Sequence, residues 1–112
     1  MNYQHKSLAE ERWSKLSLAD QLANIGAEVG RAAKWENKDE DLFESAVLRA
    51  LELFDLTLHD SRWEGRLKEI ARLKEVFLDG VDGGKEYKTS LLDLENYFMP
   101  FMIFSRNQAF SK

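Results

Sequence analysis

The chain of 112 residues carries a net charge of −4 at pH 7, is 44% hydrophobic with seven Phe, three Trp and three Tyr, and contains no Cys. This length allows one domain with one modest core, and the apolar content excludes general disorder. The acidic charge gives no general attraction to nucleic acid or anionic lipid, and the absence of Cys favours a reducing compartment, so we expect a cytoplasmic protein that binds neither.

No segment of the sequence predicts targeting to a membrane. Residues 1–16 alternate polar and charged residues without an apolar stretch, so we expect no conventional signal peptide. Ser7 followed by Glu10 predicts a short N-terminal helix. The longest apolar run, 97–104, contains Pro100 and is far shorter than the roughly 20 residues that span a bilayer.

The first long helix is predicted over 17–35. Ser17 with Asp20 resembles a capping box, and apolar residues then recur at helical spacing from Leu18 to Val29. Beside this stripe lies a face of small residues, made of Ala23, Gly26, Ala27 and Gly30. Because glycine inside a helix costs about 1 kcal/mol against alanine, we expect another helix to approach closely here. Room for a flat ligand is the alternative.

The second helix is predicted over 39–59. Its apolar stripe consists of Phe43, Ala46, Val47, Ala50, Leu51, Phe54 and Leu58. Leu48 and Leu56 fall on the outer side, together with Glu52, Asp55 and His59. Two carboxylates and an imidazole on one face have the composition of a metal site. One helix cannot close a coordination shell, however, so we predict a solvated face without metal.

The third helix is predicted over 61–79, and Ser61 with Glu64 forms a capping box at its start. Lys74 falls at the centre of its apolar stripe, where a charged side chain needs a partner or a purpose. Lys74 either lines an internal pocket and binds an anionic group, or pairs with a carboxylate of another helix, such as Glu28 or Glu95.

Two further charge patterns have ordinary explanations. The first is a basic strip made of Arg62, Arg66, Lys68 and Arg72. Glutamates interleave with these residues at helix-pair spacing, which is typical of a solvated, salt-bridged face rather than a phosphate site. The second comprises Asp79, Asp82 and Glu86 in the glycine-bearing loop 79–88, whose spacing does not fit an EF-hand and favours a solvated turn over a calcium site.

The fourth helix is predicted over 90–108, with Thr89 or Ser90 as its cap. Pro100 removes one backbone hydrogen bond and should bend or break this helix. The segment 97–104 is apolar nearly all round, which is more than a single core can cover, so we predict a self-association surface. The residues predicted to form it are Leu48, Leu56, Tyr97, Phe101, Phe104 and Phe110.

These segments predict an all-α fold in a single domain over residues 1–112. Helices over 17–35, 39–59, 61–79 and 90–108 with short connections are typical of an up-down-up-down antiparallel four-helix bundle, here with a short N-terminal extension.

The stretch Arg72-Leu-Lys74-Glu-Val-Phe-Leu-Asp79 precedes a turn and an amphipathic segment rich in Tyr and Phe. It resembles the end of the third helix in HEPN-type helical bundles. That family includes small bundles that pair with minimal nucleotidyltransferases or act as ribonucleases, often as dimers, through an Arg placed shortly before a His. Arg72 or Lys74 would take the basic position, but Asp79 stands at the His position and no histidine follows. The resemblance therefore implies the bundle and the dimer, and not the ribonuclease.

The residue types needed for chemistry are scarce. The chain has no Cys, its only imidazoles are His5 and His59, and no glycine loop has phosphate-binding spacing. We therefore expect no catalytic residue, no metal and no cofactor, and predict a protein that acts by protein–protein interaction, as a homodimer or with an unlike protein. The alternative is a degenerate HEPN-type bundle that partners a nucleotidyltransferase, or that binds nucleotide or RNA through Lys74, Arg72 and Tyr97.

Overall fold

All regular structure in the described part of the chain is helical. The computed structural model describes residues 9–110, and of residues 109 and 110 the backbone alone. Residues 9–13 are helical and lead into the longer elements. These are α2 (Leu18–Trp35), α3 (Glu40–Leu58), the 3₁₀ helix η1 (Ser61–Arg66), α4 (Leu67–Val81) and α5 (Leu91–Phe110). The all-α prediction is confirmed, whereas Ser7, the predicted start of the N-terminal helix, lies outside the described residues.

Three helix starts carry a side-chain cap, and two of these caps, Ser17 and Ser90, were predicted. The Ser17 hydroxyl accepts a hydrogen bond from the Asp20 backbone N–H at 3.1 Å. The Asp39 carboxylate accepts from the Leu42 N–H at 3.0 Å. At the start of α5 the Ser90 hydroxyl accepts from the backbone N–H three residues on, also at 3.0 Å. Each bond satisfies an N–H group that the first turn of a helix leaves without an internal partner.

The start of the third helix was predicted wrongly. The capping residue is Asp60 rather than Ser61, because the Asp60 carboxylate accepts from the Arg62 backbone N–H at 3.1 Å. The six residues that follow form η1, in which Trp63 has the non-helical angles φ −105° and ψ 22°. The α-helix begins only at Leu67 and ends at Val81, so the predicted range 61–79 holds two elements.

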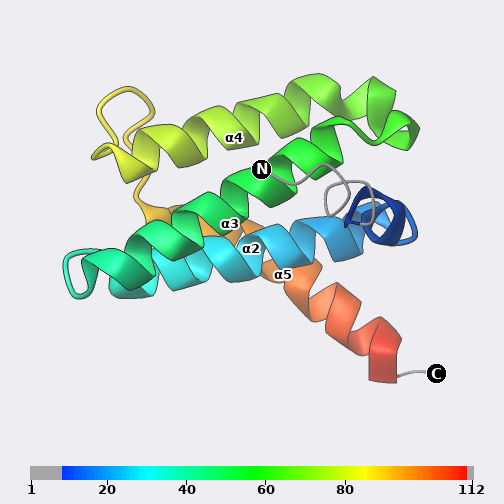
Figure 1. Ribbon diagram of the computed structural model, residues 1–112, viewed down its shortest axis with the longest axis horizontal. Coiled ribbons are helices and arrows are strands. Elements are labelled where there is room, and N and C mark those ends of the chain that lie inside the picture. The colour runs from blue at the N-terminus through cyan, green and yellow to red at the C-terminus, as the bar shows by residue number, and fades with distance from the viewer. Residues whose placement is uncertain (1–8, 111–112) are drawn as a thin grey trace.

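The element α2 lies between two neighbours, since it packs against both α3 and α5. The remaining long helix, α4, packs against α3 and also contacts α5. In Figure 1, α2 and α4 run in one direction across the view and α3 and α5 in the other. Rings from three helices meet at the centre: the Phe54 centroid on α3 lies 5.8 Å from Phe77 on α4 and 6.4 Å from Phe98 on α5.

The small-residue face of α2 receives α5, as expected for a close helix–helix contact. A Cβ atom added at Gly26 would lie 2.5 Å from the Cβ of Phe98, and one added at Gly30 would lie 3.0 Å from the Cδ of Glu95. Further along, the Ser105 hydroxyl of α5 donates to the Asp20 carboxylate of α2. The glycines therefore allow the two backbones to approach more closely than larger residues would permit.

The element α5 continues as one α-helix through Pro100, so a break at this residue is not observed. Proline leaves the carbonyl of Asn96, an exposed residue, without its helical partner. The last turns of α5 lead away from the other helices (Figure 1). This course leaves much of the apolar segment 97–104 without cover from its own chain.

Candidate functional site

Lys74 lies between α3 and α4 and is paired with a carboxylate. Its Nζ atom is 2.8 Å from Oδ1 of Asp55 on α3, and the two side chains are 29% and 53% exposed. The partner is therefore neither Glu28, which pairs with Arg31, nor Glu95, which lies against Gly30. Asp55 was predicted on the solvated face of α3, so Lys74 sits at the edge of the apolar stripe rather than at its centre.

Arg72 and Tyr97, the other two predicted ligand-binding residues, make separate contacts. The Arg72 guanidinium lies 5.7 Å from the centre of the Tyr87 ring and its Nε is 3.7 Å from Glu75. The Tyr97 ring on α5 packs edge-on against Phe98, with centroids 5.5 Å apart. These contacts do not unite Lys74, Arg72 and Tyr97 in one cluster.

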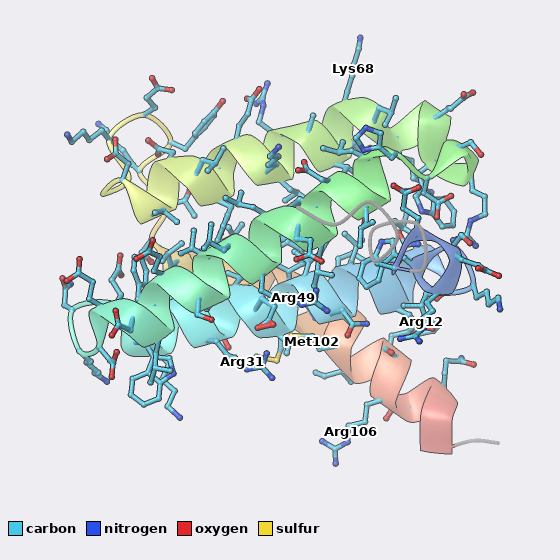
Figure 2. The ribbon with its side chains drawn as sticks, viewed as in Figure 1. Arg12, Arg31, Arg49, Lys68, Met102 and Arg106 are labelled. Atoms are coloured by element: carbon cyan, nitrogen blue, oxygen red, sulfur yellow. The ribbon has the colours of Figure 1, made fainter. Side chains whose placement is uncertain are left out.

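The basic strip along η1 and α4 is a solvated face, as predicted. Arg66 lies 3.8 Å from Glu69, at the i, i+3 spacing of helix pairs, and Arg72 pairs with Glu75 at the same spacing. Lys68 projects from α4 into solvent (Figure 2). Acids and bases therefore alternate on this face, and they present no continuous positive surface.

The loop after α4 is tied to its own acidic residue. The Asp79 carboxylate accepts hydrogen bonds from the Glu86 and Tyr87 backbone N–H groups at 3.0 and 2.9 Å. The Tyr87 hydroxyl donates to Glu75 at 2.9 Å, and this bond raises the pKa of the phenol. Among residues 9–110 no three His, Cys, Asp or Glu side chains are placed to hold a metal ion.

A polar network that the sequence did not predict joins the N-terminal segment to the end of α3. The buried Gln21 side chain donates to the Trp13 carbonyl and to the Asp60 carboxylate, both at 2.9 Å, and accepts from the Trp63 indole at 3.0 Å. The Trp13 indole donates to the Thr57 hydroxyl at 2.9 Å. The available sequence signal was the two indole N–H groups, which need acceptors when their rings are buried.

Asp60 is the charged member of this network. Its side chain is only 5% exposed and lies 2.7 Å from the Arg62 guanidinium, which also donates to the Leu16 carbonyl at 2.7 Å. The hydrogen bonds from Arg62 are the largest cause that lowers the pKa of Asp60, from 3.8 to about 2, although burial acts in the opposite direction. Asp60 is therefore held ionised by its neighbours.

An open depression of about 340 Å³ lies beside this network. Its lining consists of Glu10, Glu11, Trp13, Ser14, Leu56, His59, Asp60 and Ser61. The Asp60 carboxylate is already bound by Arg62 and Gln21, and Nδ1 of His59 is 2.8 Å from the Asp55 carbonyl. Asp60 and His59 are thus engaged by groups of the same chain.

Among residues 9–108, whose side chains the structure describes, the outer face of α5 holds half of the large exposed apolar residues. We use this name for five residues of α5, which are exposed by 37 to 61% and fall in two stripes along the helix: Leu92, Met99 and Ile103 in one, Tyr97 and Phe104 in the other. Between Glu95 and Arg106 no residue is charged. Met102 lies at the contact with α2, whereas Arg106 projects from the last turns (Figure 2).

The structure separates the residues predicted to form the interface. Tyr97 and Phe104 belong to the outer face of α5, and Phe101 is partly buried beside it, whereas the side chain of Phe110 lies outside the described residues. The other two predicted residues are on α3, where Leu48 is exposed.

The prediction that Leu56 lies on the outer side of α3 is wrong, since it is only 8% exposed. The N-terminal segment accounts for this burial, because Trp13 belongs to the same core cluster and bonds the neighbouring Thr57. Leu92, Met99 and Ile103 were missed as members of the α5 surface, although the apolar run from 97 to 104 was a usable signal for Met99 and Ile103.

Within residues 9–110 no helix is long and apolar enough to cross a membrane. Comparison with known proteins finds no family model, no curated protein and no solved structure that matches this chain.

Proposed function

We propose that this protein acts without catalysis, by protein–protein interaction through the outer face of α5, as a homodimer in the cytoplasm. The proposal includes an up-down-up-down antiparallel four-helix bundle as the scaffold that presents this face. One observation carries it: five large apolar side chains on one helix remain between 37 and 61% exposed, with no charge between residues 95 and 106. The absence of Cys supports a reducing compartment.

The size of this face supports a binding role. Large apolar side chains bury about 200 Å² each, so the outer face of α5 exposes on the order of 500 Å². A typical monomer has a largest apolar patch of about 300–600 Å², and patches of that size are often functional. Scattered single leucines, such as Leu48 on α3, need no such explanation.

The test is the molar mass in solution, measured by light scattering over a range of concentrations. We expect about twice 13.0 kDa for the natural chain. Ile103→Glu places a charge in the outer face of α5 and should give a monomer. Leu48→Glu is the matched control, because it makes the same change at a similarly exposed residue of α3, and it should remain a dimer. A dimer that Leu48→Glu dissociates and Ile103→Glu does not would refute the proposed surface.

The alternative implied by the HEPN resemblance ranks second. Binding of nucleotide or RNA through Lys74 would require its ammonium to give up the ion pair with Asp55, whose Oδ1 is 2.8 Å away, and to contact a phosphate instead. Arg72 is likewise engaged with Glu75 and the Tyr87 ring. Pairing with a nucleotidyltransferase would use an interaction surface, as the first proposal does, with an unlike protein in place of the second copy.

A further inference from the structure

The charges of α5 lie at the two ends of its apolar run. The exposed Asp93 precedes the run and Arg106 follows it, whereas Glu95 packs against Gly30 of α2. Pro100 is exposed and lies midway between the acidic and the basic end. A parallel pair of α5 helices would place like charges together, whereas an antiparallel pair centred near Pro100 places the acidic end of each helix beside the basic end of the other. Such complementarity fixes orientation and register.

The exposed area fits a second copy. A stable interface buries about 800 Å² per partner, of which the apolar residues of the outer face of α5 would supply on the order of 500 Å². At about 100° per residue the exposed Asn96 and Asn107 fall between the two apolar stripes of this face, so they would lie inside the contact and supply polar surface there. Direct hydrogen bonds are a regular part of such interfaces, at about one per 100–200 Å².

The course of α5 also favours an antiparallel pair of α5 helices. Its last turns lead away from the helices of their own chain (Figure 1), yet they follow directly on the exposed Ile103 and Phe104. In an antiparallel pair the C-terminal half of one α5 lies along the N-terminal half of the other. The last turns of α5, which lead away from the helices of their own chain, are then covered by the second copy.

We infer that two copies of this chain pair through antiparallel α5 helices, with the twofold axis near Pro100. This inference rests on the proposed function and adds the occupant and its geometry. A twofold axis makes the contact self-complementary, so the same residues serve both copies and the assembly closes as a dimer.

The absence of Cys from the natural chain makes disulfide cross-linking a direct test. Met99→Cys places a thiol beside the proposed axis, where the two copies of residue 99 come within the Cα separation of about 7 Å that a disulfide requires. Leu92→Cys is the matched control on the same face. At 1.5 Å per residue it lies about 12 Å along the helix from the axis, so its two copies are about 24 Å apart.

We expect Met99→Cys to form a disulfide-linked dimer under mild oxidation at least tenfold faster than Leu92→Cys. An equal mixture of Leu92→Cys and Asn107→Cys chains should give mainly the mixed disulfide, because residues 92 and 107 lie at equal distances on either side of the axis. The molar mass of each reduced variant is measured in parallel by light scattering.

The outcomes separate the inference from the function on which it rests. Equal and rapid linking by Leu92→Cys and Met99→Cys in a dimer would mean parallel helices, which overturns the inference and leaves the dimer intact. A dimer in which no α5 cysteine links would overturn both the inference and the proposed surface. Reduced chains that stay monomeric at every concentration would overturn the homodimer itself.

Discussion

Asp60 shows how one residue can connect three segments of the chain. Its carboxylate caps η1, binds the Arg62 guanidinium and accepts from Gln21 of α2. Gln21 in turn binds the Trp13 carbonyl, so the N-terminal segment is held to the end of α3 through this residue. A nearly buried carboxylate is stable here because each of its neighbours donates a hydrogen bond to it.

The low pKa of Asp60 predicts a specific pH dependence of stability. Because its pKa falls from 3.8 in the unfolded chain to about 2 in the folded one, Asp60 stabilises the fold above pH 3.8 and loses this contribution as the pH falls toward 2. The difference corresponds to about 2 kcal/mol.

Asp60→Asn should therefore have a lower free energy of unfolding than the natural chain, and this loss should depend on pH. We expect the gap between the two proteins to be about 2 kcal/mol larger at pH 6 than at pH 2. Urea titrations at several pH values measure both curves. Glu44→Gln is the control, since it makes the same kind of change at an exposed residue of α3 that takes no part in the Asp60 network. A constant gap for Asp60→Asn would contradict the assigned role.

The Lys74–Asp55 pair is half open to solvent, and such pairs contribute about 0–1 kcal/mol. Lys74→Met should therefore change the free energy of unfolding by less than about 1 kcal/mol, as should Lys68→Met on the solvent side of the same helix. Thermal melts with and without ATP or GMP complete the test. We expect no nucleotide to shift the Tm of either variant or of the natural chain. A rise that Lys74→Met abolishes and Lys68→Met retains would favour the anion-binding alternative.

At the scale of the elements, the contact of α2 with α5 depends on Gly26 more than on Gly30. An alanine Cβ at position 26 would overlap the Cβ of the fully buried Phe98, whereas at position 30 it would meet the flexible end of Glu95. Overpacking of a core contact costs about 1–3 kcal/mol, more than the gain of about 1 kcal/mol in helix propensity.

Gly26→Ala should thus lower the free energy of unfolding by about 1–2 kcal/mol, while Gly30→Ala stays near neutral. Gly65→Ala in η1 is a control without steric conflict, because no atom lies within 4 Å of the added Cβ. Chemical denaturation of the three variants gives the comparison. Equal losses of stability at positions 26 and 30 would mean that the side chain of Glu95 cannot move aside, and would contradict the distinction between the two glycines.

The caps that the sequence predicted are local, and part of what it missed depends on distant segments. Ser17 and Ser90 act on N–H groups three residues on, so their patterns were sufficient. The Asp60 cap is local as well, since it acts on the Arg62 N–H, but the pattern of Ser61 with Glu64 competed with it one residue later. The burial of Leu56, by contrast, follows the docking of the distant N-terminal segment.

The candidate surface divides in the same way. The apolar character of 97–104 is visible in the sequence, but which of its sides stays exposed is decided by the packing of α5 on α2. The ion-pair partner of Lys74 could not be predicted for a similar reason. Several helices carry carboxylates, and only the packing of the helices selects Asp55.

At the scale of the whole molecule, the chain is slightly more open than a compact domain of its length. Its radius of gyration is 14.1 Å, against about 13 Å for 112 residues. The last turns of α5 lead away from the other helices and add to this extent (Figure 1). If a second copy covers them, the association energy becomes part of the stability of each chain, and unfolding depends on concentration.

The Tm of the natural chain should therefore rise by about 2–4 °C for each tenfold increase in protein concentration. Leu48→Glu should keep this slope, since its charge lies on α3, whereas Ile103→Glu should abolish it because a buried charge prevents the pairing of the α5 helices. Differential scanning calorimetry at several concentrations measures all three. A natural chain whose Tm is independent of concentration would show that the outer face of α5 adds nothing to stability, and the search for its occupant would then turn to an unlike protein.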